Sequence, residues 1–412
     1  MAGLIRDISL AESGRQKIEW IKKNMPILTM IENELSVSQP LSGIRISLSI
    51  HLEAKTAYLA EVLVSAGAEV SVTGSNPLST QDDVAAALSK AGLTVNAWYG
   101  STPEEYSIHI EKALENYPHI IIDDGGDLTY MLHNKRHDLM RDLVGGCEET
   151  TTGISRLRAM EKDNLLKFPM IAVNNASSKY LFDNRYGTGQ SVFDGINRTT
   201  NLIVAGKYVV VAGYGWCGKG VSLRAKGLGA KVIVTEIDPV KSIEAIMDGF
   251  EVMPMSEASS IGDIFITVTG CEKVIHNEHF AKMKDGVILC NAGHFDCEIC
   301  LPELKEMAIE TKEQRKNIVG YMMKDGRWIN VLGEGRLVNL ACGDGHPAEI
   351  MDMSFALQIL SAKYLLENYH SLSAAVYDVP KEIDRHVASM KLKTWNISID
   401  KLTPSQEKYL RG

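Results

Sequence analysis

Strand-like apolar runs alternate with helix-length segments through most of this chain, and the alternation begins twice. The first series starts at 44–50, where every second residue is apolar, and continues through 68–72 and 95–98. The second series begins near 207 with a run of valines and ends at about 339. Strands separated by helices form mainly parallel sheets with helices on both faces. The sequence therefore predicts an α/β fold with two doubly wound, Rossmann-like domains.

The length of 412 residues agrees with this division, because single hydrophobic cores stop growing beyond about 250–300 residues. We expect the second series to be inserted into the first, so that one domain comprises 1–184 and 345–380 and the other comprises 185–344. A helix predicted over 353–368 has a broad apolar face that can close back onto the first domain. Residues 381–412 are predicted to form a small helical C-terminal tail.

The charge distribution restricts the partners of the chain. The formal net charge is -9 and no Lys/Arg-rich run is present, whereas nucleic-acid binding requires clustered positive charge. No apolar stretch approaches the roughly 18 residues of a membrane span. The first 20 residues also lack the apolar region of about 7 to 15 residues that marks a secretory signal. We expect a small-molecule ligand and neither a nucleic-acid nor a membrane partner.

The cysteines indicate a reducing compartment. There are seven, an odd number, and most lie inside apolar segments, which is typical of free thiols in the cytoplasm. Only Cys297 and Cys300 have the spacing of a metal-binding pair, and a closed zinc site requires a second pair. We therefore predict a cytoplasmic protein without a bound metal.

A glycine-rich turn follows the first strand of the second series. Gly213, Gly215 and Gly218 have the spacing of a dinucleotide-binding loop, where glycines allow a tight turn, a close approach of the pyrophosphate and close helix–strand packing. Free amides at the start of the next helix would bind the phosphates. The following strand ends at Glu236, whose carboxylate would accept hydrogen bonds from a ribose diol and repel a 2′-phosphate. The pattern predicts NAD rather than NADP.

Polar residues also stand at the ends of predicted strands in the first series. His51 follows the strand at 44–50, Asp124 lies in a turn after a later strand, and Asn174 follows a third. Each could singly be a satisfied histidine, a turn residue or a cap. Ligands of open parallel sheets bind beyond the carboxyl ends of the strands, so we expect these side chains to converge on one site.

Eight segments resemble those of S-adenosylhomocysteine hydrolases, in unbroken order from about residue 15 to the C-terminus. The short chain resembles the archaeal and thermophilic-bacterial form of the family. The segments are SIHLEAKTA (49–57), SNPLSTQDD (75–83), DDGGDLT (123–129), EETTTG (148–153), KYLFDNRYGTGQS (179–191), VVVAGYGWCGKG (209–220), NAGHFD (291–296) and EGRLVNLACGDGHP (334–347).

The resemblance implies a hydrolase that contains a dehydrogenase site. In this family, bound NAD takes a hydride from the 3′ carbon of the ribose, and the resulting ketone acidifies the 4′ proton. Homocysteine thiolate then leaves the 5′ carbon, water adds, and the hydride returns. Such activation is required because general base catalysis alone contributes only about 10²- to 10⁴-fold. The cofactor performs the difficult step and is regenerated.

The resemblance also implies roles on the substrate side. Lys179 would accept the 3′-hydroxyl proton while Asp183 holds the hydroxyls, and we expect burial to lower the pKa of Lys179 toward that of a useful base. Asp124 and His51 would handle the 4′ proton and the group at the 5′ position. The remaining expected residues are Glu149 at the ribose hydroxyls, Asn184 between substrate and cofactor, His294 and His346 closing the pocket, and Glu53, Lys55 and Thr56 after His51.

On the cofactor side, the glycine turn and Glu236 are joined by further residues. The resemblance implies that these contact the nicotinamide or a ribose. The full set is Thr150, Thr151, Thr152, Asn184, Gly213, Gly215, Gly218, Glu236, Asn291 and Asn339.

The purine of the substrate is left open by the sequence. Lys55 could donate to the carbonyl of hypoxanthine, whereas Glu53 could accept from the amine of adenine. The family's main reaction is reversible hydrolysis of S-adenosyl-L-homocysteine, and S-inosyl-L-homocysteine is the alternative substrate.

Two further classes fit parts of the pattern. An NAD-dependent 2-hydroxyacid-type dehydrogenase would also combine two doubly wound domains with a histidine-bearing loop. A catalytically silent NAD or nucleoside sensor would be expected to lack the equivalents of Lys179 and His51, and both are present. The family resemblance further implies a homo-oligomer, usually a tetramer.

Overall fold

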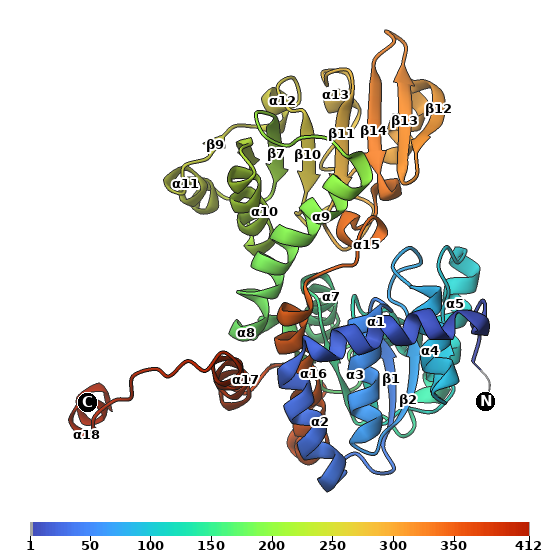
Figure 1. Ribbon diagram of the computed structural model, residues 1–412, viewed down its shortest axis with the longest axis vertical. Helices are drawn as coiled ribbons and strands as arrows, with labels where there is room; N and C mark the ends of the chain where they lie inside the picture. The colour runs from blue at the N-terminus through green and yellow to red at the C-terminus, as the bar shows by residue number, and fades with distance from the viewer. Residues whose placement is uncertain (1–2, 412) are drawn as a thin grey trace.

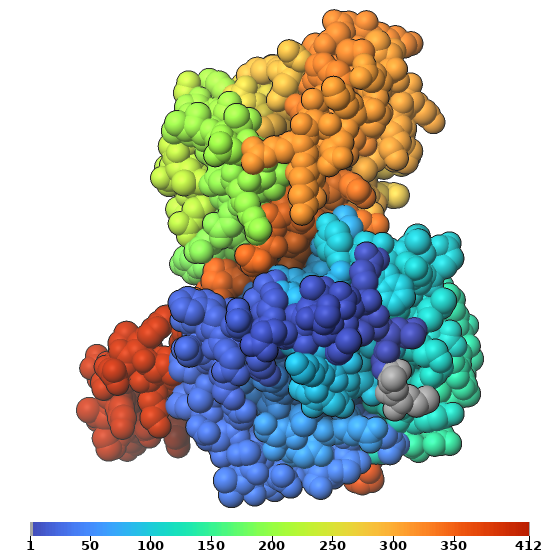
Figure 2. Space-filling model, turned by 45° about the vertical axis from the view of Figure 1, so that its right-hand side comes forward, coloured from blue at the N-terminus to red at the C-terminus, as the bar shows by residue number. Residues whose placement is uncertain are grey.

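A computed structural model describes residues 3–411 and shows two α/β bodies, one above the other along the long axis (Figure 1). The lower body contains the sheet of the first strand series, and the upper body contains that of the second. Figure 2 shows a waist between them, with the red C-terminal segment projecting from the side of the lower body. The predicted fold class is confirmed.

The lower sheet has seven strands, all parallel, in the order β15-β6-β5-β4-β1-β2-β3. Its strands are buried on both faces, as parallel strands usually are; Ile120 and Ile122 pack on one side and Ile121 on the other. The strands are β1 (Arg45–Ser49), β2 (Glu69–Thr73), β3 (Thr94–Asn96), β4 (Ile120–Asp123), β5 (Gly145–Glu148), β6 (Met170–Ala172) and β15 (Val376–Asp378).

Helices cover both faces of the lower sheet. Two helices meet near Pro26: α1 ends at Lys23, and Pro26 opens α2, where its missing N–H costs nothing. The α-helices are α1 (Ala11–Lys23), α2 (Pro26–Ser38), α3 (Ala54–Ser65), α4 (Asp82–Lys90), α5 (Pro103–Leu114), α6 (Asp127–Asn134), α7 (Thr151–Lys162), α16 (Ala348–Asn368) and α17 (Lys381–Thr394). Short 3₁₀ turns are η1 (Ile8–Leu10), η2 (His137–Met140), η3 (Val173–Asn175) and η6 (Tyr369–Ser371).

The upper sheet has eight strands in the order β12-β13-β14-β11-β10-β7-β8-β9. Valines of β7 again point to both faces, with Val209 and Val211 in one core cluster and Val210 in the other. The strands are β7 (Tyr208–Ala212), β8 (Lys231–Thr235), β9 (Glu251–Val252), β10 (Ile264–Thr267), β11 (Val287–Asn291), β12 (Ala308–Arg315), β13 (Ile318–Met323) and β14 (Trp328–Leu332).

The antiparallel edge of this sheet is a feature that the periodicity did not predict. β13 pairs antiparallel with both β12 and β14. β12 is exposed along nearly its whole length and rich in charge, so it lacks an apolar pattern. Charged side chains are a common protection for an edge strand.

Helices of the upper body surround its sheet and connect it to the lower body. No helix within residues 3–411 is both long and apolar enough to cross a membrane. The helices are α9 (Thr188–Thr200), α10 (Trp216–Gly227), α11 (Pro239–Met247), α12 (Met255–Ala258), α13 (Asn277–Phe280), α14 (Leu301–Met307) and α15 (Val338–Ala341), with a 3₁₀ turn η5 (Gly333–Gly335). The short helix α8 (Ser177–Tyr180) belongs to the lower body, where it contacts α16 and α17.

The two sheets share one strand order. Numbered by appearance, the parallel strands run 3-2-1-4-5-6 in the upper sheet and 3-2-1-4-5-6-7 in the lower, so each sheet has its switch point between its first and fourth strands. In the lower sheet these strands are β1 and β4, and in the upper sheet β7 and β10. Ligands of such sheets bind at the switch point, which places two binding crevices in one molecule.

A π-helical turn, η4 (Asp183–Gly187), joins α8 to α9. The Phe182 carbonyl accepts hydrogen bonds from the amides of both Tyr186 and Gly187, at 2.8 and 2.9 Å. Such turns are rare and are frequent at functional sites. Asp183 and Asn184 lie in this turn.

The C-terminal segment consists of two unlike helices. α17 packs against α2, α8 and α16, and it buries Val387 and Lys391. α18 (Pro404–Arg411) has no buried residue and lies apart from both bodies (Figure 1). α17 is therefore part of the lower body, whereas α18 projects away from it.

Candidate active site

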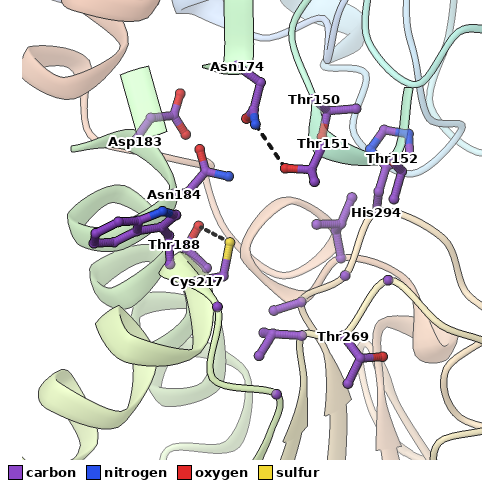
Figure 3. Close-up of a pocket in the computed structure, with 18 of the residues that line it drawn as sticks. Thr150, Thr151, Thr152, Asn174, Asp183, Asn184, Thr188, Cys217, Thr269 and His294 are labelled. Atoms are coloured by element: carbon purple, nitrogen blue, oxygen red, sulfur yellow. Dashed lines mark hydrogen bonds between the residues drawn. The ribbon is translucent and has the colours of Figure 1, made fainter. Parts of the chain in front are cut away.

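One cavity of about 1170 Å³ lies between the two bodies and collects the carboxyl ends of both sheets. Figure 3 shows side chains entering it from both: Thr150–Thr152 and Asn174 come from the lower body, and Cys217 and Thr269 from the upper. The predicted site residues that line it are His51, Glu53, Lys55, Thr56, Asp124, Glu149, Thr150, Thr151, Thr152, Lys179, Asp183, Asn184, Gly213, Gly215, Glu236, His294, Asn339 and His346.

Two predicted residues do not line the cavity. A Cβ on Gly218 would lie 2.0 Å from the Gly213 carbonyl oxygen, so Gly218 serves close packing behind the turn. The fully buried Asn291 donates from Nδ2 to the carbonyls of Gly293 and Phe295 and accepts from the Gly293 amide. Asn291 thereby shapes the loop that presents His294 to the cavity.

The glycine turn has the geometry of a phosphate-binding loop. Gly213 has φ +103°, a conformation that favours glycine, and α10 starts directly after Gly215. Glu236 is held beside the turn, since its carboxylate accepts the Tyr214 amide at 2.7 Å and the Ile237 amide at 2.7 Å. With the phosphates of a dinucleotide bound at the start of α10, the carboxylate lies where it can accept hydrogen bonds from the neighbouring ribose diol.

Unpartnered polar atoms in the cavity fit the remainder of a dinucleotide. Thr152 Oγ1 and Asn339 Oδ1 are buried without a hydrogen-bond partner among residues 3–411, and both residues line the cavity. Buried polar groups in proteins are rarely left unpaired. Together with the turn and Glu236, they provide the donors and acceptors that NAD requires.

Lys179 is at the centre of a buried charge cluster that lines the same cavity. Its Nζ donates to Asn174 Oδ1 at 3.0 Å and Asn184 Oδ1 at 3.1 Å. It also lies 3.5 Å from Asp183 Oδ2 and 3.6 Å from Glu149 Oε1. A lysine amine flanked by two carboxylates can exchange protons with either of them and with a bound hydroxyl.

The expected lowering of the Lys179 pKa is wrong. Burial lowers the pKa, but the charges of Asp183, Glu149 and Asp124 raise it by more, so it lies above its ordinary value. Burial raises the pKa of Glu149 to about 7, against the opposing charge of Lys179. Of the two carboxylates beside Lys179, Glu149 is consequently the one that titrates near neutral pH.

Asp183 differs from Glu149 in its pKa. Burial alone would raise its pKa, but the charges of Lys179 and His346 and hydrogen bonds from His346 and Ser354 hold it well below the usual range. His346 Nδ1 lies 2.7 Å from Asp183 Oδ1. Asp183 is therefore an anion over the whole physiological pH range.

A second cluster lies beyond the ends of β1 and β4. His51 Nε2 is 3.4 Å from Asp124 Oδ2, and His294 Nδ1 is 3.9 Å from Asp124 Oδ1. Burial lowers the pKa of His51 to about 4, although Asp124 opposes this, so His51 is neutral at pH 7 and suited to proton transfer. The three side chains offer ligand atoms within 4.8 Å of one another, a spacing that could also hold a divalent cation.

The start of α3 forms a polar end of the cavity. Lys55 Nζ donates to Glu53 Oε2 at 2.6 Å and to the Asp344 carbonyl at 2.8 Å. Thr56 Oγ1 donates to the His51 carbonyl at 2.7 Å. Lys55 retains a third proton and Glu53 a second oxygen, so the pair can offer one donor and one acceptor to a ligand.

Four supporting residues were missed by the site prediction. Glu148, fully buried, accepts the amides of Gly125 and Thr150 through Oε1 and so ties two site loops together. Asp384 of α17 accepts the amides of Ser177 and Ser178 and caps the helix that carries Lys179. Ser354 and Gln358 of α16 contact the carboxylates beside Lys179. The only sequence signal of Glu148, Ser354 and Gln358 is a polar residue within a buried segment, and Asp384 lies in a largely exposed helix without such a signal.

Matched doubly wound sheets, a glycine turn and a polar cavity define an NAD-binding α/β enzyme. Two family models match the chain: S-adenosyl-L-homocysteine hydrolase over residues 3–142, and the S-adenosyl-L-homocysteine hydrolase NAD binding domain over 184–345. The chain belongs to the S-adenosyl-L-homocysteine hydrolase family.

Near full-length relatives agree with this family. The S-inosyl-L-homocysteine hydrolase of Methanocaldococcus jannaschii is 57% identical over 98% of this chain and 98% of the relative. The adenosylhomocysteinase of Pyrococcus abyssi is 56% identical over 99% of this chain and 97% of its own length. That of Thermotoga maritima is 56% identical over 97% of this chain and 99% of its own.

Proposed function

We propose that the protein catalyses the reversible hydrolysis of S-adenosyl-L-homocysteine to adenosine and L-homocysteine. The observation that carries the proposal is the buried Lys179, flanked by two carboxylates, in the same cavity as the glycine turn. When bound, NAD supplies a hydride acceptor for the 3′ carbon of the ribose. The glycine turn, Glu236, Asn339 and Thr150–Thr152 would hold it.

On the ribose side, Lys179 accepts the 3′-hydroxyl proton. Because its ammonium form is favoured, it must first release a proton, and Glu149 Oε1 at 3.6 Å is the group best poised to receive it. Asp183 remains ionised and accepts hydrogen bonds from the ribose hydroxyls. Asn184, bonded to Lys179, lies at the border with the glycine turn.

At the 5′ side, Asp124 and His51 transfer the remaining protons. Asp124 abstracts the acidified 4′ proton, and His51, neutral in the resting site, relays that proton to the departing thiolate and later takes one from the attacking water. Ser79 Oγ lies 2.8 Å from His51 Nδ1 and orients the ring. His294 and His346 complete the walls of the cavity.

S-Inosyl-L-homocysteine is a second candidate substrate, favoured by the free ammonium proton of Lys55. Adenine presents a donor at position 6 and an acceptor at N1, and hypoxanthine presents the reverse. Lys55 facing position 6 selects hypoxanthine, whereas Glu53 facing position 6 selects adenine. A pocket that pairs such groups can discriminate by about 10⁴-fold.

We further infer the organisation and surroundings of the protein. Residues 1–184 and 345–380 form the substrate-binding domain and 185–344 the NAD-binding domain. Within the predicted tail, 381–412, α17 packs on the substrate-binding domain and α18 projects away from it. Seven free thiols support a cytoplasmic location. Exposed apolar side chains at the C-terminal end support a homo-oligomer, proposed as a tetramer, in which a second copy covers them: Trp395, Ile397, Ile399, Leu402, Tyr409 and Leu410.

Incubation of NAD-loaded protein with each thioether separately, in deuterium oxide, tests these proposals. Release of homocysteine together with deuterium in the ribose is expected, and the faster substrate identifies the purine. Turnover of neither thioether would contradict the hydrolase assignment. Net accumulation of free NADH with a 2-hydroxy acid would favour a dehydrogenase instead.

A further inference from the structure

Helix α16 adds two buried side chains to the cluster around Lys179, and neither lines the cavity. Ser354 donates from Oγ to Asp183 Oδ2 at 2.7 Å, and Gln358 donates from Nε2 to Glu149 Oε2. Both are fully buried. Four residues apart, they share one face of the helix. One helix therefore contacts both carboxylates that flank the lysine.

The two carboxylates are held unequally. Both oxygens of Asp183 have partners, because Oδ1 lies 2.7 Å from His346 Nδ1 while Oδ2 receives the Ser354 hydroxyl. Glu149 receives Gln358 on Oε2 only, and its Oε1 has no hydrogen-bond partner in the described part of the chain. That free oxygen is the one that faces Lys179.

We propose that Ser354 and Gln358 are positioning residues for the two carboxylates: Gln358 tunes how readily Glu149 shares the Lys179 proton, and Ser354 orients Asp183, which stays ionised. This rests on the proposed function, in which Lys179 accepts the 3′-hydroxyl proton. The proton passes from Nζ to Glu149 Oε1, which gives a neutral amine and a neutral acid. The amine lone pair then takes the hydroxyl proton, and the charge of the protein rises by one.

The charges around the cluster agree with this direction of transfer. Burial brings the pKa of Glu149 to about 7; Lys179 and Gln358 lower it, while Asp183 and Asp124 raise it. Asp183 faces Lys179 and His346, which keep its pKa well below the usual range despite burial. Hydrogen bonds to a charged group stabilise its ionised form. The Gln358 bond thus makes Glu149 less ready to take a proton, alongside the larger effects of burial and of the charges of Lys179 and Asp183.

The test is the pH dependence of bound-NAD reduction in a single turnover with the thioether that the wild-type protein hydrolyses. The acid limb of this pH–rate profile is the fall in rate at low pH as Glu149 becomes protonated. In Gln358→Met, ionised Glu149 loses a donor, so its pKa rises and the acid limb moves up by about one pH unit. Below that limb the rate falls about tenfold. In Ser354→Ala the limb stays in place, because Lys179 and His346 still keep Asp183 ionised, and only the rate falls, by about threefold.

Ser361→Ala is the matched control, since this buried α16 hydroxyl has no partner among residues 3–411; its rate and limb should equal those of the wild type. A second readout needs no turnover: ¹³C NMR of glutamate-labelled, cofactor-free protein should show a higher Glu149 midpoint in Gln358→Met. Gln358→Leu replaces this variant if it does not fold.

An unmoved limb and midpoint in the Gln358 variant would overturn the inference, as would equal limb shifts in both variants. These outcomes differ from failure of the proposed function, in which the wild-type protein would not reduce its NAD with either thioether.

Discussion

The two sheets have the same strand order and opposite chemistry at their switch points. Beyond β7 and β10 the upper sheet presents glycine backbone and hydroxyls, with Gly213 and Thr269 lining the cavity. Beyond β1 and β4 the lower sheet presents His51 and Asp124. One topology therefore supports either a surface that binds phosphates or a set of groups that transfer protons.

The difference shows that strand order determines where a ligand binds and the loop residues determine what happens to it. Backbone amides bind a phosphate without help from a titratable side chain. The proton-transfer groups of the lower body depend on burial, which moves the pKa of Glu149 to about 7 and that of His51 to about 4. Variants at the two switch points should consequently fail in different ways.

The largest effect is expected from Lys179→Met, which removes the amine of the lower site. The rate of bound-NAD reduction should fall about 10³-fold, within the range of general base catalysis, while NAD content stays unchanged. Stopped-flow absorbance measures the rate. Lys363→Met is the control, because that lysine pairs with Glu367 near the surface of α16. A loss of NAD from the Lys179 variant would mean that the two sites are not separable.

Gly213→Ala should damage only the upper site. At φ +103°, an added Cβ is strained and lies 3.1 Å from the Val268 carbonyl oxygen, so NAD affinity should fall by about 10- to 100-fold. Calorimetric titration of cofactor-free protein measures it. Gly206→Ala carries the same left-handed strain with nothing within 4 Å of the Cβ. Equal NAD affinities in the two variants would refute the role of the turn.

Asp384→Ala tests how the lower site is supported. Loss of this cap should destabilise the protein by about 1–2 kcal/mol and slow bound-NAD reduction by roughly three- to tenfold through a misplaced Lys179. Faster hydrogen exchange of the Ser177 and Ser178 amides should accompany the loss. Thr102→Ala removes a cap from α5, which carries no site residue, and should cost stability alone. Similar rate losses in both would mean that Asp384 has no special role.

The smallest effect is expected from chelation. His51, Asp124 and His294 are proposed to transfer protons and shape the cavity, so treatment with EDTA should leave homocysteine release unchanged. Added Zn²⁺ tests the same cluster in the opposite direction, since its three ligand atoms within 4.8 Å could bind the ion and inhibit. Activity that is lost with EDTA and restored by metal would contradict the proposal of a metal-free site.

Residues with a periodic or positional signal were predictable. The alternation of apolar strand-like runs with helix-length segments predicted β1, β7 and β8, and the glycine spacing predicted the turn at Gly213. Three features had no such signal. β12 is exposed and charged, Ser354 and Gln358 are polar residues within a helix whose partners are distant in sequence, and the Lys179 pKa depends on charges from three other segments. Each is determined by tertiary contacts.

The π-helical turn at Asp183–Gly187 has one consequence for how the site can change. Such a turn contains about one residue more than an α-helical turn, and each residue rotates a helix by about 100°. Deleting one residue there would yield a regular helix that turns α9 about 100° relative to α8, which α16 and α17 hold in the lower body. The orientation of the upper body relative to Lys179 is thus specified by how many residues separate the lysine from α9, a property that no single substitution would reveal.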